Sequence, residues 1–264
     1  MSLVNQSKLS FLFKPIYLLA SLLSVSPLYA GLPDTIEKIK PGIVGVGTVL
    51  PTRRPPNKLQ GTGFVVGNGL YIITNAHVVD NDLDKENREH FAVFTGRGDD
   101  AGAHSVEVIA VDQAHDLALL KLKDKEKLFA LTLGREKNVR EGQVYAFTGF
   151  PIGAVLGLYP ATHRGIVSTI SPVATPVVSP KDLDVRMIKR LRNPFNVFQL
   201  DATAYPGNSG SPLYDPETGE VIGVINKVFV KETKEAVLEK PSGITYAIPV
   251  THVRVLLEKN GVAY

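Results

Sequence analysis

The sequence predicts an all-β fold, either a barrel or a sandwich, for a chain of 264 residues. The first observation behind this prediction is a series of about eleven short runs rich in Val, Ile, Leu and Phe, separated by Gly, Pro, Asn and Asp. The second is the composition: 23 Gly and 18 Pro favour many turns, while 44% hydrophobic and 21% charged residues exclude disordered, collagen-like and coiled-coil chains. Short strands without regular helices between them are typical of antiparallel folds rather than βαβ units.

Residues 1–30 are predicted to be a secretory signal peptide. Lys8 and Lys14 precede the apolar stretch 16–25, and the segment ends at Ala30. A basic start, a short apolar middle and a terminal small residue form the leader pattern, and the apolar stretch is too short to span a bilayer comfortably. We expect cleavage after Ala30, a periplasmic or secreted protein, and no membrane span in the mature chain.

Charge and cysteine content exclude several classes of function. Without its leader the chain has 27 basic residues, two fewer than the full 29, against 26 acidic residues, so a nucleic-acid partner is not expected. The chain has no Cys, which excludes thiol nucleophiles, Cys-ligated zinc and iron–sulfur clusters. Leu28 is larger than the residue that usually lies three positions before a leader cleavage site, so retention of the leader as a membrane anchor stays open.

The mature chain is expected to open with a short helix within 31–40, which Pro41 ends. The predicted strands are 43–50, 63–68, 70–76, 91–96, 106–111, 117–122, 143–149, 165–170, 198–203, 221–229 and 244–250. A longer helix is expected at the end, where Thr251 can cap the segment VRVLLEK and Asn260 and Gly261 can stop it.

Two segments interrupt the series of strands, and both are predicted to be surface loops: 51–60 and 179–194. The second carries five bases against two acids. These are Lys181, Arg186, Lys189, Arg190 and Arg192, with Asp182 and Asp184. A solvated loop, a contact for an anionic partner and a regulatory loop beside an active site all remain open.

The segment DATAYPGNSGSPL, residues 201–213, is the most informative for function. Its glycines predict a tight turn between two strands, which can expose the hydroxyl of Ser209. The same turn can direct the backbone N–H groups of Gly207 and Ser209 into one cavity. The segment therefore predicts a nucleophile with an oxyanion hole, although by itself it also fits an ordinary hairpin loop.

A serine nucleophile needs a base, and His77 is the strongest candidate among six histidines. It ends an apolar strand in TNAHVV, where a rigid strand and turn can fix its ring; a histidine buried in the core is the alternative. His115 and His163 are weaker candidates. The remaining histidines, His90, His104 and His252, are expected to be solvated or structural.

The base in turn needs a carboxylate to orient it, and Asp116 directly precedes the apolar strand LALLKL. Asp112 is its competitor. His77, Asp116 and Ser209 follow one another at spacings of 39 and 93 residues. The order His, Asp, Ser is that of chymotrypsin-like barrels and differs from the orders in subtilisins and α/β-hydrolases.

Seven segments together make the sequence resemble the protease domain of HtrA/Deg-type serine proteases. In order they are TNAHVV, DLALLKL, GFPIG, GIVSTI, QLDATAYPGNSGSPL, VIGVI and GITYAIP. The opening LPDTIEKIKPGIVGV and the closing VRVLLEKNGV resemble the two ends of that domain, so the resemblance covers nearly all of 31–264.

The resemblance implies two six-stranded antiparallel β-barrels of chymotrypsin-like fold, with the active site between them. We expect the N-terminal barrel in 31–135, and the C-terminal barrel with a short terminal helix in 136–264. Relatives usually continue into PDZ domains, whereas this chain stops at Tyr264, so no PDZ domain is expected. Members of the family often form trimers through their N-terminal segment, and a homotrimer remains open.

By residue, the resemblance implies His77 as general base, Asp116 as the group that orients it, and Ser209 as nucleophile. It places the amides of Gly207, Asn208 and Ser209 at or beside the oxyanion hole. No metal or organic cofactor is expected. The implied substrates are unfolded or extended polypeptides.

Three further residues bear on specificity. Relatives more often read GNSGGP, and Ser211 here matches secreted glutamyl endopeptidases, whose acid-binding pocket histidine is replaced by Ile225. Thr203 stands where trypsin-like specificity would require an acid. A pocket without charge predicts cleavage after small or medium aliphatic residues. A protease-like binding or chaperone protein with a latent site and a secreted endopeptidase of narrow specificity are the alternatives.

Overall fold

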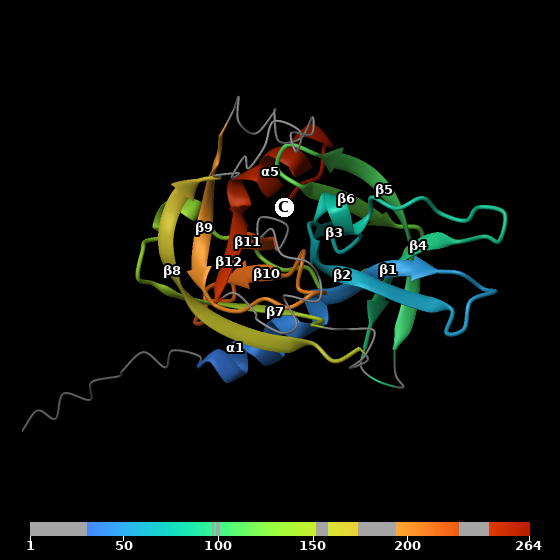
Figure 1. The fold of residues 1–264 in the computed structure, drawn as a ribbon, viewed down its shortest axis with the longest axis horizontal. Helices are drawn as coiled ribbons and strands as arrows, with labels where there is room; N and C mark the ends of the chain where they lie inside the picture. Colours follow the sequence, from blue (N-terminus) through green and yellow to red (C-terminus); the bar gives the residue numbers. More distant parts are fainter. Residues whose placement is uncertain (1–30, 97, 99–100, 152–157, 174–193, 227–242) are drawn as a thin grey trace, which may run out of the picture.

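The computed structural model describes residues 31–264 except 97, 99–100, 152–157, 174–193 and 227–242. The predicted leader and nearly all of the basic loop 179–194 lie outside the described residues. Two closed six-stranded barrels stand side by side, which confirms the all-β prediction and the chymotrypsin-like architecture (Figure 1). No helix within the described ranges is long and apolar enough to cross a membrane.

The first barrel has the strand order β1-β2-β3-β6-β5-β4. Its strands are β1 (Ile43–Val49), β2 (Asn57–Val66), β3 (Tyr71–Thr74), β4 (His90–Thr95), β5 (Gly102–Asp112) and β6 (Leu117–Leu122). β2 begins at Asn57, inside the segment 51–60 that was predicted as a loop. That prediction was wrong for its last residues because Asn57, Lys58 and Leu59 pair with the end of β1 and extend the hairpin beyond the core.

The second barrel has the strand order β10-β11-β12-β9-β8-β7. Its strands are β7 (Val144–Gly149), β8 (Ala161–Pro172), β9 (Asn196–Asp201), β10 (Pro212–Tyr214), β11 (Val221–Asn226) and β12 (Ile244–Pro249). The sequence analysis missed β10. This strand has only three residues and begins with Pro212, so it carries neither an alternating pattern nor a run of β-branched residues.

Two helices flank the barrels. α1 (Leu32–Ile39) opens the described chain and continues into the 3-10 turn η1 (Lys40–Gly42), as the sequence predicts. α5 (Val250–Lys259) follows β12 directly, and its N-cap is Pro249, without a side-chain capping bond. The prediction of a Thr251 cap was wrong because the cap lies two residues earlier, at Pro249, and the helix follows β12 without an intervening turn. Asn260 ends α5, as predicted.

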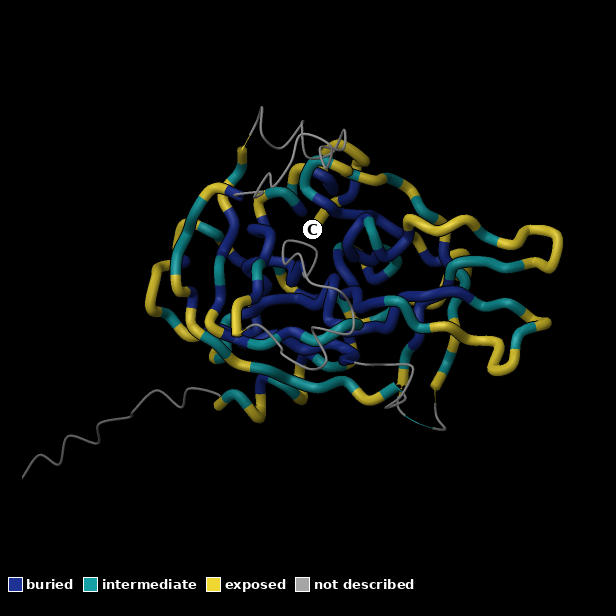
Figure 2. The backbone as a smooth tube through the Cα atoms, viewed as in Figure 1, coloured by how far each residue is buried: buried dark blue, intermediate teal, exposed yellow. Residues whose placement is uncertain are grey.

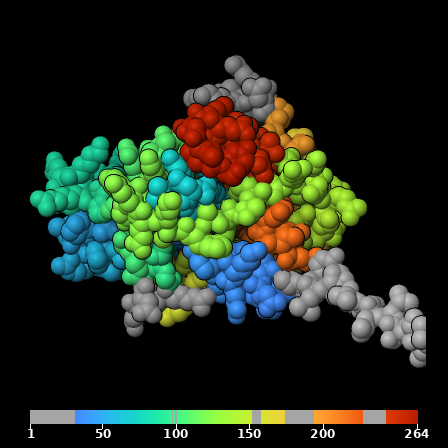
Figure 3. Space-filling view, turned by 180° about the vertical axis from the view of Figure 1, so that it is seen from behind, coloured from blue at the N-terminus to red at the C-terminus, as the bar shows by residue number. Residues whose placement is uncertain are grey.

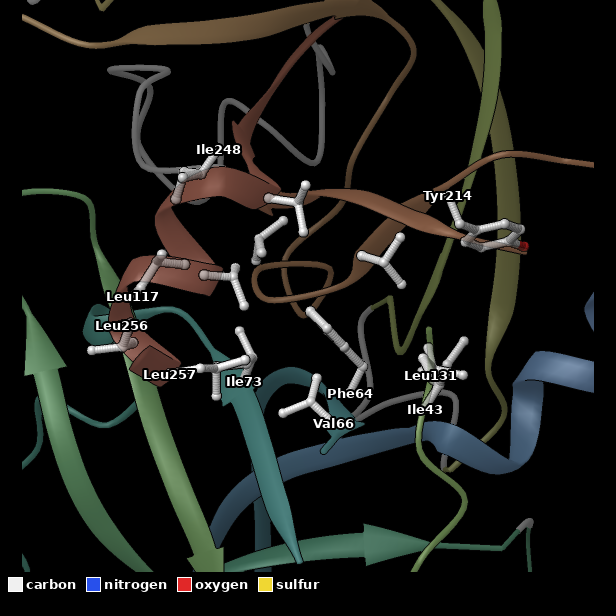
Figure 4. Packing of buried hydrophobic residues seen from close by; sticks show 14 of the residues in the cluster. Ile43, Phe64, Val66, Ile73, Leu117, Leu131, Tyr214, Ile248, Leu256 and Leu257 are labelled. Carbon is white, nitrogen blue, oxygen red and sulfur yellow. The ribbon is translucent and has the colours of Figure 1, made fainter. Parts of the chain in front are cut away.

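Three apolar clusters hold the fold together. One fills the first barrel around Val46, Ile72 and Leu120, and another fills the second barrel around Phe147 and Phe198. The third joins the two barrels, and its labelled members come from both of them and from α5 (Figure 4). The buried backbone is accordingly concentrated where the barrels meet (Figure 2), and α5 lies against both barrels when seen from behind (Figure 3).

Candidate active site

His77 lies on a single 3-10 turn, η2 (Ala76–Val78), that follows β3. Its Nδ1 is 2.7 Å from Oδ2 of Asp116, and its backbone N–H donates to Oδ1 of the same carboxylate at 3.0 Å. The N–H of Ala76 donates to the backbone carbonyl of Asp116 at 3.1 Å. These contacts fix both the orientation of the ring and the position of the turn that carries it.

Asp116 is a buried carboxylate, 4% exposed, in the turn between β5 and β6. Its φ of 54° lies in the left-handed region, an unusual conformation for a residue other than glycine that recurs at functional sites. Asn226, at the end of β11, donates its Nδ2 to Oδ2 of Asp116 at 2.7 Å, and Asn75 donates to its backbone carbonyl at 3.0 Å. The carboxylate is thus held from both barrels.

The pKa of Asp116 is lowered from its ordinary value. Burial by itself would raise this pKa, but the hydrogen bonds and charge of His77, together with the hydrogen bond from Asn226, outweigh burial. The carboxylate is therefore ionised at neutral pH. It can hold the His77 proton on Nδ1 and leave Nε2 to accept a second proton.

The structure separates the two competing aspartates. Asp112 lies next to His115, with Oδ2 2.7 Å from Nδ1, whereas Asp116 lies next to His77. His115 in turn stacks on His252, with ring centroids 3.9 Å apart. Asp112 therefore belongs to a separate cluster beside α5.

Ser209 lies in the tight turn between β9 and β10 and is a buried residue, 7% exposed. Gly207 has a φ of 97°, which a residue with a side chain rarely adopts. The N–H of Asn208 donates to the carbonyl of Tyr205 at 3.0 Å, so this amide is used within the turn. In the described part of the chain no partner is recorded for the amides of Gly207 and Ser209. The oxyanion hole stays a prediction, and these two amides are the ones available to form it.

The turn that contains Gly207 and Ser209, called the nucleophile turn below after the predicted role of Ser209, belongs to the second barrel but is bonded to Thr62 of the first. The N–H of Thr62 donates to the carbonyl of Ser209 at 2.8 Å, and its hydroxyl donates to the carbonyl of Gly207 at 2.7 Å. The same hydroxyl accepts the N–H of Phe150 at 3.0 Å. Thr62 thereby fixes the backbone on both sides of Asn208.

The sequence analysis missed two residues of this arrangement, Thr62 and Asn226. Both are completely buried polar residues in otherwise apolar strands. A polar side chain in such a strand is a usable signal, because buried polar groups require hydrogen-bond partners. Neither strand, however, indicates which partner that would be.

The predicted pocket residues lie on both sides of the turn. Thr203 is partly exposed before it, whereas Ile225 is completely buried in the core of the second barrel. The backbone of Ile225 reaches the turn, since its carbonyl accepts the N–H of Gly210 and its N–H donates to the carbonyl of Ser211, both at 2.9 Å. Their contact with substrate stays a prediction.

The other histidines have structural surroundings. His163 stacks on Phe147 with ring centroids 5.0 Å apart, and burial lowers the pKa of His163. Among the residues that the structure describes, no group of three or more His, Cys, Asp and Glu side chains is placed to hold a metal ion. The chemistry that this site can perform rests on a hydroxyl, an oriented imidazole and two backbone donors, which suit acyl transfer.

Comparisons with known proteins identify the family of the chain. Residues 61–224 match the family model of the trypsin-like peptidase domain. The chain is 32% identical over 235 residues to serine protease HTRA1 of Xenopus tropicalis, covering 88% of this chain and 43% of that protein. It is also 32% identical over 190 residues to a probable periplasmic serine endoprotease DegP-like of Halomonas elongata, covering 72% and 32%.

A solved structure of the HtrA-type protease AlgW with a tripeptide has the same fold, with a TM-score of 0.61 at 23% identity. The match covers 87% of this chain and 63% of that one. The chain spans less than half the length of the two curated relatives named above.

Proposed function

The chain belongs to the trypsin-like peptidase family, among its HtrA-type members, and on this premise we propose that it is a serine endopeptidase with His77, Asp116 and Ser209 as its catalytic residues. The observation that carries the proposal is the contact between Nδ1 of the partly exposed His77 and Oδ2 of the buried Asp116, at 2.7 Å, beside a serine turn with two unused amides.

The reaction begins when Oγ of Ser209 attacks the peptide carbonyl and Nε2 of His77 takes the hydroxyl proton. Asp116 stabilises the resulting imidazolium, and the amides of Gly207 and Ser209 bind the oxyanion. His77 then protonates the leaving amine, which yields an acyl-enzyme. Water, activated by the same imidazole, releases the acyl group and restores the hydroxyl of Ser209.

The proposal extends to substrate and location. The substrates are unfolded or extended polypeptides, cleaved after small or medium aliphatic residues that enter an uncharged pocket near Thr203 and Ile225. The leader pattern of 1–30 and the periplasmic DegP-like relative support export. Assembly as a homotrimer is part of the same proposal and is tested by the mass of the protein in solution.

A second candidate function is a binding protein with a latent site. It is favoured by one observation: among the described residues no hydrogen bond is recorded between Ser209 and His77, and Ser209 is buried. Catalytic hydrogen bonds of this kind often tighten only when substrate binds, so the observation is compatible with both functions.

The deciding experiment is a time course of the purified protein with unfolded casein, beside Ser209→Ala. Fragments are identified by mass spectrometry and the active serine by a fluorophosphonate label. Many cuts after aliphatic residues, lost together with the label in the variant, support the endopeptidase; cuts at a single bond indicate a narrow specificity. Labelling without cleavage indicates the latent site, and absence of both overturns the proposal.

A further inference from the structure

A cavity of about 450 Å³ opens where the β1–β2 hairpin meets the end of β4 and the start of the segment before β8. Leu59, Phe94 and Leu158 form apolar parts of its wall, and the cations Arg53 and Lys58 also line it. The proposed catalytic residues do not include any of these. The cavity therefore requires its own explanation.

The cavity lies on the same face of the first barrel as the contact that holds the nucleophile turn. Gly45 in β1 pairs with Thr62 on one side and with Phe94 on the other. Residues opposite one another in antiparallel strands place their side chains on one face, and neighbouring strands are about 4.8 Å apart. Phe94 is thus about 10 Å from Thr62, which bonds directly to the backbone of Ser209.

A β-bulge brings Leu59 to this face as well. Val46 pairs with Gly61 and Gly47 with Leu59, so Gln60 is the extra residue of β2. The bulge restores Leu59 to the face that carries Thr62, three residues away. A side chain at Gly45 would collide with Leu59 and crowd Leu158, so the glycine allows these two leucines to cover the strand.

The position of His77 indicates which half of a substrate would reach the cavity. The turn that carries His77 packs on β2, since a side chain at Gly61 would collide with Val78 and with the carbonyl of Ser209. His77 must face the amine that it protonates. We therefore place the leaving half of the substrate beside β2, the strand that also carries Leu59.

Charge further defines the occupant. The segment 51–60 contains three bases and no acid. Arg53 pairs with Glu89 at 2.9 Å, yet its Nε is buried and has no partner recorded among the described residues. Lys58 is exposed, and within the same described ranges no ion pair is recorded for it. An acidic group near the cavity would find an available cation in Lys58.

We propose that this cavity is a specificity site for the leaving half of the substrate, which binds a large apolar side chain two or three residues after the cleaved bond with an acidic residue beside it. The distance of about 10 Å equals three residues of extended chain. The inference rests on the proposed endopeptidase function and adds a recognition element to it.

The test uses quenched fluorescent peptides with one constant acyl half and varied leaving halves. Leu, Phe, Ala or Ser occupies the second or third position, followed by Asp or Lys. Each kcat/KM is divided by that for a p-nitroanilide with the same acyl half, which has no leaving residues. We expect Leu and Phe to exceed Ala about tenfold, and Asp to exceed Lys several-fold at low salt.

Lys58→Glu and Lys85→Glu form a matched pair of charge reversals, because Lys85 is also exposed, in the loop before β4, and does not line the cavity. We expect Lys58→Glu to reverse the preference for Asp over Lys and Lys85→Glu to retain it. Leu158→Ser should reduce the preference for Leu and Phe. Equal ratios for Leu and Ala, or equal effects of the two charge reversals, overturn the proposal.

Failure of the endopeptidase function would be recognised separately. In that case the wild type cleaves neither peptide nor p-nitroanilide and takes no fluorophosphonate label. Fluorescence anisotropy of the labelled peptides with Ser209→Ala protein then decides the cavity alone. About tenfold tighter binding of the Leu peptide than of the Ala peptide supports the specificity site, and equal binding overturns it.

Discussion

His252 makes the stability of the protein dependent on pH between neutral and mildly acidic conditions. Its ring stacks on His115, with centroids 3.9 Å apart, and meets Phe195 edge-on at 5.0 Å. Burial, aided by the charge of the neighbouring His115 and opposed by that of Asp112, lowers the pKa of His252 to about 4. We predict that acid weakens the contact between α5 and the loop that carries Asp116.

The sign follows from linkage. The pKa of His252 is lower in the folded than in the unfolded chain, so its stability contribution is complete above about 6.5 and is lost as pH falls toward 4. At pH 5 the shift corresponds to about 2 kcal/mol relative to pH 7.5. Partial solvent exposure screens the ring, which reduces the expected loss to about 1 kcal/mol.

The assay is urea unfolding of the wild type and of His252→Phe at pH 7.5 and pH 5.0. Phe retains a flat ring in the stack and cannot take up a proton. Other groups titrate in both proteins, so they cancel in the comparison. Between the two pH values the wild type should lose about 1 kcal/mol more than the variant. Equal losses in the wild type and His252→Phe would refute the reasoning.

Three further predictions concern the site. Asn226→Ala leaves the buried carboxylate of Asp116 with one hydrogen-bond donor fewer, which should raise the activation barrier by about 2 kcal/mol. For a p-nitroanilide, kcat should then fall roughly thirtyfold with KM little changed. A fall in kcat of less than about threefold would contradict this role of Asn226. Thr62→Val removes both hydrogen bonds of the Thr62 hydroxyl, to Gly207 and to Phe150, and should lower the rate of fluorophosphonate labelling about tenfold. A labelling rate equal to that of the wild type would show that other contacts hold the turn. Gly149→Ala places a methyl group on the hydroxyl of Ser211 and should cost about 1–3 kcal/mol in urea unfolding, and combination with Ser211→Ala should recover part of this loss.

Most of the fold was accessible from the sequence because each long strand repeats a signal. A run such as LALLKL before a turn predicts β6 without reference to any other segment, and IEKIK followed by Pro41 predicts α1 in the same way. β10 could not be found, because a strand of three residues depends on its partners β7 and β11 rather than on its own pattern. The start of α5 was misplaced for a similar reason, since β12 fixes it from outside the helix.

The same distinction applies to the candidate site: its local motifs could be predicted from the sequence, whereas contacts between distant segments could not. His77, Asp116 and Ser209 could be proposed because their order and motifs are local features. Thr62 and Asn226 could not, because each acts across the boundary between the barrels on a partner more than 100 residues away. The pairing of Asp116 rather than Asp112 with His77 is likewise a result of three-dimensional placement.

The location of the proposed site between the barrels predicts that catalysis depends on their relative position. His77 and Asp116 belong to the first barrel and Ser209 to the second, and the apolar cluster that includes Leu257 joins the two. Leu257→Ala should cost about 2–5 kcal/mol of stability, as should Leu120→Ala inside the first barrel, because both side chains are completely buried.

The two substitutions leave cavities in different parts of the core, one between the barrels and one inside the first barrel. A cavity at Leu257 permits the barrels to shift, and a displacement of about 1 Å between reacting groups can lower a rate roughly a hundredfold. A cavity at Leu120 lies within one barrel and leaves the distance between His77 and Ser209 in place. In native buffer, Leu257→Ala should therefore lose kcat far more than Leu120→Ala at equal loss of stability. Equal kcat values would show that the bonds from Thr62 and Asn226 align the site without the apolar interface.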